Sequence, residues 1–87
     1  MKIFYTRKFV SLYKNLSPII KLKAERQEKI FRENIFYPSL NTEKLMPKKN
    51  NLWIFRVDGT YRIVFNFEGN SATFLYIGHH KDIYRFF

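Results

Sequence analysis

Three apolar segments separated by two short turns dominate the second half of the sequence. The segments are residues 52–57, 61–67 and 72–79, and the turns carry Asp58-Gly59 and Glu68-Gly69-Asn70. Segments of this length that are rich in β-branched and aromatic residues and end at Gly-containing turns are typical of strands joined as hairpins. The pattern therefore predicts a three-stranded antiparallel meander, and the rest of the chain must extend or cover that sheet.

Two helices are predicted before the meander. Thr6 is suited to be the N-cap of the first helix, whose apolar side chains recur at helical spacing: Phe9, Leu12, Tyr13 and Leu16. Ser17 and Pro18 then form an N-cap and first-turn pair that begins a second helix running to about Asn34. Because the link is so short, the two helices must form a hairpin.

Two further segments complete the predicted fold. Lys2–Tyr5 is rich in β-branched and aromatic residues and predicts a short strand that pairs with the meander. Residues 35–51 lose all periodicity, which predicts a long loop held to the core by Leu40 and Leu45. Residues 1–87 therefore predict one α+β domain of order β-α-α-β-β-β, with a helical hairpin packed on a twisted antiparallel sheet.

Composition limits the classes of function. The chain is 46% hydrophobic and has no Cys, which argues against a disordered chain, a disulfide framework and a thiolate metal site. No long apolar stretch indicates a signal peptide or a membrane span, so we expect a cytoplasmic protein without a membrane partner. Lys and Arg total 16 against 7 Asp and Glu, a net charge of +9 that suits RNA or another polyanion, although an acidic protein partner would satisfy it equally.

Arg56 and Arg62 lie inside otherwise apolar predicted strands. A guanidinium group there is costly unless it meets an anion, so an anionic ligand is one interpretation. The other is that each Arg pairs with Glu43, Asp58 or Glu68, or lies on a solvated face. A two-residue turn would place the two Arg on opposite faces of the hairpin, and a three-residue or bulged turn would place them on the same face.

His79 and His80 are adjacent at the end of the last predicted strand, and Tyr84 follows them. In an extended chain the two imidazoles point to opposite faces, so one of them is expected to face a given site. Imidazole titrates near neutral pH and suits proton transfer, while a phenol donates a hydrogen bond or stacks on a base. The alternative is a pair of solvent-exposed His. Ligand spacing for zinc is absent, and we expect no metal or cofactor.

Most of the aromatic residues are expected to form the core. Alternation along the predicted strands assigns five Phe to buried sheet positions: Phe4, Phe55, Phe65, Phe67 and Phe74.

The order of elements and two motifs resemble the toxins of the RelE/ParE superfamily over essentially the whole chain. The motifs are Arg-x-x-x-x-Tyr-Arg, which ends at Arg62, and Gly-His-His-x-x-x-Tyr, which ends at Tyr84. The resemblance implies a toxin of a type II toxin–antitoxin system that cleaves messenger RNA on the ribosome and so inhibits translation. It also implies a cognate antitoxin that neutralises the toxin in a hetero-oligomer.

The resemblance also implies roles for individual residues. Glu43 corresponds to a YoeB-type general base, and Arg56 and Arg62 to groups that bind the phosphate and stabilise its charge. His79 or His80 with Tyr84 corresponds to the acid and base-orienting end of the site.

Basic residues near this group are expected to hold RNA through its phosphates. They are Lys44, Lys48, Lys49 and Arg85. The Lys pair of RelE itself is replaced here by Trp53, Ile54 and Phe55, so the likeness is closer to YoeB.

ParE members share this fold but inhibit DNA gyrase without cutting RNA, which gives an alternative function. The combination of His and Tyr at the C-terminal end favours the nuclease.

Overall fold

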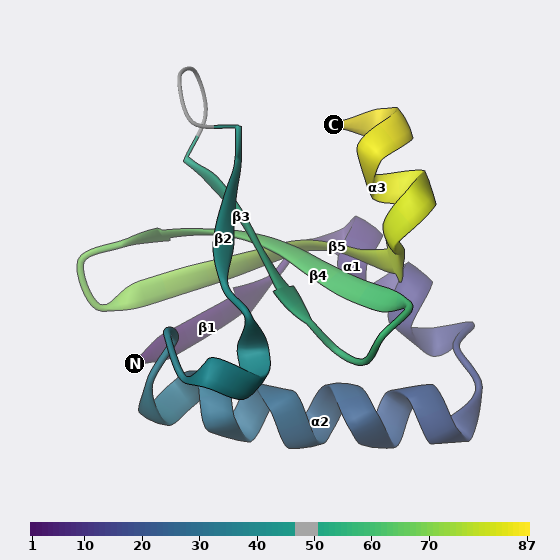
Figure 1. The fold of residues 1–87 in the computed structure, drawn as a ribbon, viewed down its shortest axis with the longest axis horizontal. Coiled ribbons are helices and arrows are strands. Elements are labelled where there is room, and N and C mark those ends of the chain that lie inside the picture. The colour runs from purple at the N-terminus through teal and green to yellow at the C-terminus, as the bar shows by residue number, and fades with distance from the viewer. Residues whose placement is uncertain (47–50) are drawn as a thin grey trace.

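The computed structural model describes residues 1–46 and 51–87. Within them five strands form one sheet, with two helices on one face and a third on the other (Figure 1). The elements in chain order are β1 (Lys2–Tyr5), α1 (Arg7–Lys14), α2 (Pro18–Glu33), a 3-10 turn η1 (Pro38–Leu40), β2 (Glu43–Met46), β3 (Leu52–Arg56), β4 (Tyr61–Glu68), β5 (Ser71–His79) and α3 (His80–Phe86).

The helical hairpin forms as the sequence predicts. The side chain of Thr6 accepts from the backbone N–H of Phe9 at 3.1 Å and so caps α1. Ser17 caps α2 in the same way by accepting from Ile20 at 3.4 Å, and α2 ends at Glu33. Local hydrogen bonds therefore set where both helices begin.

The α+β class and the order of the predicted elements are confirmed, but the sheet is mixed rather than wholly antiparallel. Its strand order is β1-β5-β4-β3-β2, and β1 pairs with β5 in parallel, with Lys2 opposite Ser71. The three other pairings are antiparallel. Side chains alternate between the two faces of a sheet in both parallel and antiparallel strands. The alternation therefore carries no information about strand direction.

Two elements are additional to the predicted order: one lies within the predicted loop, and the other follows the last predicted strand. Strand β2 pairs antiparallel with β3 through a register shift between Lys44 and Met46. Helix α3 begins after His79 and packs Ile83 on the sheet. Both elements are short, and neither has enough residues to show a clear periodicity.

The sheet separates two apolar clusters of different size. Helices α1 and α2 cover the larger one, whose fully buried aromatic side chains are Phe31, Phe55, Phe65 and Phe74. On the opposite face α3 covers the smaller one, made of Ile54, Val64 and Ile83. The prediction that Phe4 is buried is wrong, because β1 is an edge strand and this side chain is 54% exposed.

Candidate functional site

Arg56 and Arg62 are direct cross-strand partners in the β3–β4 hairpin, so their side chains share one face of the sheet. Alternation places them on the face that α3 covers, because Phe55 and Ile63 point to the larger cluster. The loop between the strands contains four residues, 57–60. The sequence left two arrangements open, and the longer turn with both Arg on one face is the one that forms.

Asp58 fixes the shape of this loop. Its Oδ1 accepts from the backbone N–H groups of Thr60 and Tyr61 at 2.8 and 2.7 Å, and Lys23 of α2 donates to Oδ2 at 3.4 Å. Burial raises the pKa of Asp58, but these hydrogen bonds outweigh it and the pKa is lowered overall. The carboxylate is therefore engaged within the turn and does not neutralise either Arg through a direct ion pair.

Backbone carbonyls orient the guanidinium of Arg62. Its Nη1 donates to the carbonyl oxygens of Asp58 and Tyr61 at 2.8 and 3.1 Å. Partial burial, followed by the charge of Arg56, lowers the pKa of Arg62, whereas Tyr84, Asp58 and Glu43 act in the opposite direction. Two guanidinium groups held side by side create a positive field that favours an anion between or above them.

Arg56 is held by two residues that sequence reasoning did not single out. The Asn41 amide, with its oxygen turned toward Arg56, accepts from Nε and Nη2 at 3.1 and 3.2 Å. Gln27 of α2 donates to the carbonyl oxygen of Arg56 at 2.8 Å. Asn41 adopts a left-handed conformation with φ of 50°, and the tolerance of Asn for that conformation is the signal that was available in the sequence.

The two imidazoles take different positions. His79 lies opposite Tyr61 in the sheet, with ring centroids 6.2 Å apart, and its Nδ1 accepts from the N–H of Lys81 at 3.1 Å, which caps α3. His80 begins α3 and lies near Arg62. Desolvation, followed by the charges of His79, Arg62 and Lys81, lowers the pKa of His80. The backbone N–H of His80 donates to the carbonyl oxygen of Thr60 at 2.9 Å, which places the start of α3 against the β3–β4 loop.

Glu43 and Tyr84 complete the group around Arg62. Glu43 is exposed at the start of β2, opposite Ile54, and its carboxylate acts on the pKa of Arg62. Tyr84 lies on α3 with 60% of its surface exposed and acts on the same guanidinium. Arg62 is therefore paired across the strands with Arg56 and linked through charge effects to Glu43, His80 and Tyr84. These residues come from β2, β3, β4 and α3. We call these five residues the Arg62 cluster.

The predicted RNA-binding residues are less closely grouped. Lys44 lies opposite Trp53 with Nζ 5.4 Å from the indole ring, on the face away from the Arg62 cluster. Arg85 is exposed in the last turn of α3. Lys48 and Lys49 lie outside the described residues.

Within residues 1–46 and 51–87, no three His, Cys, Asp or Glu side chains gather in a metal-binding arrangement. None of the helices in this part of the chain is long and apolar enough to cross a membrane.

Solved structures of toxins share the fold. The YoeB/ParE toxin from Agrobacterium tumefaciens is 16% identical with a TM-score of 0.77, over 92% of this chain and 99% of that chain. The RelB-RelE antitoxin–toxin complex from Methanococcus jannaschii contains a chain that is 24% identical, with a TM-score of 0.75. The match covers 97% of this chain and 98% of that chain. YafQ from E. coli strain BL21(DE3) is 13% identical, with a TM-score of 0.78 over 95% and 97%.

Comparisons of sequence alone find no match. No protein-family model matches the chain, and no curated protein matches it. The structural likeness nevertheless extends over nearly the full length of both partners in each comparison. The chain therefore shares the fold of these solved toxin structures.

Proposed function

We propose that the protein is the toxin of a toxin–antitoxin pair, and that it acts in the cytoplasm as an endoribonuclease on messenger RNA in the ribosome. The observation that carries the proposal is the Arg62 cluster. It combines two adjacent cations, an imidazole, a phenol and a carboxylate on one face of the sheet. Fold alone does not separate the functions of this superfamily, so these side chains carry the argument.

The reaction class that fits is attack of a ribose 2′-hydroxyl on the adjacent phosphate. A base removes the hydroxyl proton, cations stabilise the charge that grows on the phosphate oxygens, and an acid protonates the departing 5′-oxygen. The products are a 2′,3′-cyclic phosphate and a free 5′-hydroxyl. All of these steps use groups that the chain supplies.

We assign the general base to Glu43, phosphate stabilisation to Arg56 and Arg62, and the general acid to His80. Tyr84 is assigned to contact a nucleobase or the phosphate. Arg62 suits its role because Asp58 and Tyr61 fix its Nη1 through carbonyl oxygens without neutralising its charge. Carbonyl contacts therefore preorganise this guanidinium for an anion.

The free protein disfavours the protonated form of His80. Desolvation, followed by the charges of His79, Arg62 and Lys81, lowers the pKa of this imidazole. A bound phosphate would favour the imidazolium and supply the acid where it is needed. We therefore assign proton donation to the complex with RNA rather than to the free protein.

A cognate antitoxin is the second part of the proposal. Solved structures that share the fold include RelB-RelE and DinJ-YafQ complexes. With a net charge of +9, this chain would bind an acidic segment of such a partner.

The test is cleavage of messenger RNA on purified ribosomes, combined with induced expression in a bacterial host and mapping of RNA ends. We expect growth arrest and new ends within translated codons for the wild type, and a loss of about 100-fold or more in Arg62→Ala, in line with removal of one oxyanion-stabilising donor. Tyr84→Ala should weaken cleavage as well.

Arg26→Ala is the matched control, because it removes one exposed positive charge from α2, on the other side of the sheet. It should cleave like the wild type. Arrest with intact messages would contradict the nuclease and favour the alternative, a ParE-like inhibitor of DNA gyrase, whose action should be insensitive to changes at Glu43 and His80.

A further inference from the structure

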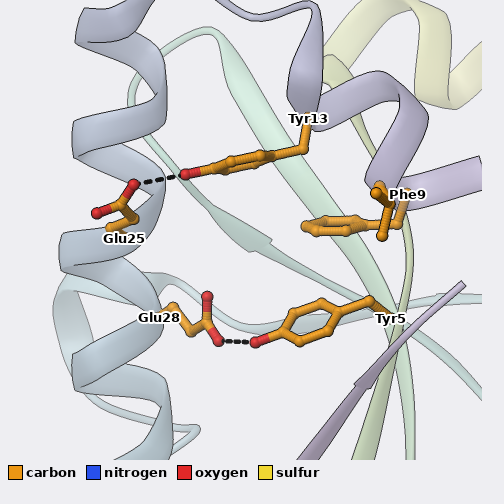
Figure 2. A pocket seen from close by; sticks show the side chains of 6 residues that line it. Tyr5, Phe9, Tyr13, Glu25 and Glu28 are labelled. Atoms are coloured by element: carbon orange, nitrogen blue, oxygen red, sulfur yellow. Dashed lines mark hydrogen bonds between the residues drawn. The ribbon is translucent and has the colours of Figure 1, made fainter.

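A second candidate site lies on the other side of the sheet from the Arg62 cluster. A cavity of about 310 Å³ opens between β1, α1 and α2 (Figure 2). Its lining residues are Tyr5, Phe9, Val10, Tyr13, Glu25 and Glu28. Strand β1 is the edge of the sheet opposite β2, the strand that carries Glu43. The function proposed above uses none of these residues.

Three aromatic rings form one side of the cavity. The Tyr5 and Phe9 rings are 5.6 Å apart at 29°, and the Phe9 and Tyr13 rings are 6.1 Å apart at 21°. Figure 2 shows Tyr5 and Tyr13 reaching toward α2 on either side of Phe9, with their hydroxyl groups at its surface. Aromatic faces in this arrangement attract a planar cation.

Two carboxylates of α2 form the facing side. Tyr13 donates to Oε2 of Glu25 at 2.6 Å, and Tyr5 donates to Oε2 of Glu28. Desolvation and the hydrogen bond to Glu25 raise the pKa of Tyr13 to about 12, and the pKa of Tyr5 is also raised. The phenols therefore stay protonated, and the two carboxylates supply the negative charge of the cavity, with Glu28 paired to Arg32.

Side chains of the protein itself already show what this surface attracts. Arg32 donates from Nη2 to Oε2 of Glu28 at 3.1 Å and to the Tyr5 hydroxyl at 3.4 Å. Lys21 lies with Nζ 5.8 Å from the centre of the Tyr13 ring. Neither cation lines the cavity.

We propose that the cavity binds a guanidinium group, with its plane against the tyrosine rings and its N–H groups directed at Glu25 and Glu28. A guanidinium is flat, is weakly hydrated and presents a fork of donors to a carboxylate, whereas an ammonium is a compact and strongly hydrated charge. The group belongs either to an arginine side chain of a partner polypeptide or to a small free cation of the same chemistry.

Binding of small probes to the intact protein tests the proposal. The probes are Nα-acetyl-arginine amide, which represents a peptide-borne side chain, and agmatine, which represents a free cation. Binding of each probe is measured from the NMR shifts of the Tyr5 and Tyr13 rings. Tighter binding of the arginine amide identifies a polypeptide ligand, and tighter binding of agmatine identifies a small molecule. The corresponding citrulline and lysine amides should bind more weakly, the neutral citrulline by about tenfold or more.

Single substitutions make the test specific. Glu25→Gln keeps an acceptor for Tyr13 but removes the charge, so affinity should fall about fivefold. Arg32→Gln removes the competing cation beside Glu28, so affinity should rise about twofold to fivefold. Glu33→Gln, at the end of the same helix and outside the cavity, should change nothing.

Two results would overturn the proposal. One is binding of the citrulline or lysine amide as tight as that of the arginine amide. The other is unchanged binding when Glu25→Gln and Glu28→Gln are combined in a protein that still folds.

Discussion

The two faces of the sheet are built differently. The face under α1 and α2 buries Phe31 against Phe55, Phe65 and Phe74, with ring centroids 4.9 to 5.7 Å apart among the pairs that involve Phe31 or Phe55. The face under α3 buries only a small aliphatic cluster, and beside it lie the polar and charged side chains of the Arg62 cluster.

This difference separates the source of stability from the candidate chemistry. Aromatic packing on the first face supplies most of the burial and needs no ligand. On the second face the Arg pair is held by backbone carbonyls and by Asn41, and within the described residues neither guanidinium forms a direct ion pair. Substitutions on the two faces should therefore affect different properties, unfolding on one and RNA cleavage on the other.

The largest expected effect is on the aromatic face. Phe31→Ala should lower the free energy of unfolding by about 3–5 kcal/mol, because it leaves a cavity among three rings. Ile83→Ala, on the α3 face, should cost about 2 kcal/mol, near the lower end for such a truncation. Urea unfolding monitored by Trp53 fluorescence measures both. Equal losses would show that the two faces contribute equally to stability.

Asp58 links the two faces through Lys23 and the β3–β4 loop. Asp58→Ala should cost about 1.5–3 kcal/mol at pH 7, because two backbone N–H groups lose a charged acceptor. The pKa of Asp58 is lowered in the folded protein, so its stabilisation is present above pH 3.8 and is lost as the pH falls through the folded value.

Urea unfolding of wild type and Asp58→Asn between pH 7 and pH 3 measures this contribution. A difference between them that stays constant over the whole range would contradict it.

His79 caps α3, the helix that carries His80 and Tyr84. We expect His79→Ala to remove the cap of the helix at a cost of about 1 kcal/mol and to reduce RNA cleavage, because His80 and Tyr84 both lie on α3. His79→Asn should restore the cap and the activity. Measuring both hydrogen exchange of the α3 amides and the cleavage rate tests whether His79 acts as the cap of α3. Loss of cleavage in both variants with α3 intact would indicate that His79 acts on the substrate directly.

The smallest expected effect is a loss of stability at high pH, caused by ionisation of Tyr13 on α1. The pKa of Tyr13 is raised to about 12 in the folded protein, mainly by desolvation and then by Glu25, whereas an unfolded tyrosine titrates near 10. Its contribution to stability is therefore complete below pH 10 and is lost between pH 10 and about 12. Tyr13→Phe should flatten this part of the stability profile, with Tyr37→Phe as an exposed control.

The sequence predicted those parts of the fold that depend on neighbours along the chain. Thr6 and Ser17 cap helices through bonds to residues three positions later, and such signals are visible in any sequence. Strand β2 and helix α3 were missed because each is defined by what it packs against. Helix α3 also uses a His as its cap, a residue outside the usual Ser, Thr, Asp and Asn preference.

For the candidate site, the residue types were predictable and their arrangement was not. The sequence singled out Arg56, Arg62 and the two His, but only the bond pattern around Asp58 places both Arg on one face. The roles of Asn41 and Gln27 depend on contacts across the fold, which no local pattern contains.

The parallel pairing of β1 with β5 has a consequence for how the molecule is assembled during folding. Lys2–Tyr5 has no partner in the sheet until Ser71–Phe74 is present, so closing this contact brings together segments that are far apart in the chain. The same late segment leads directly into His80 and Tyr84. The β1 edge and the candidate catalytic face should therefore form together in one late step, and a nascent chain that has not yet reached residue 71 would have neither.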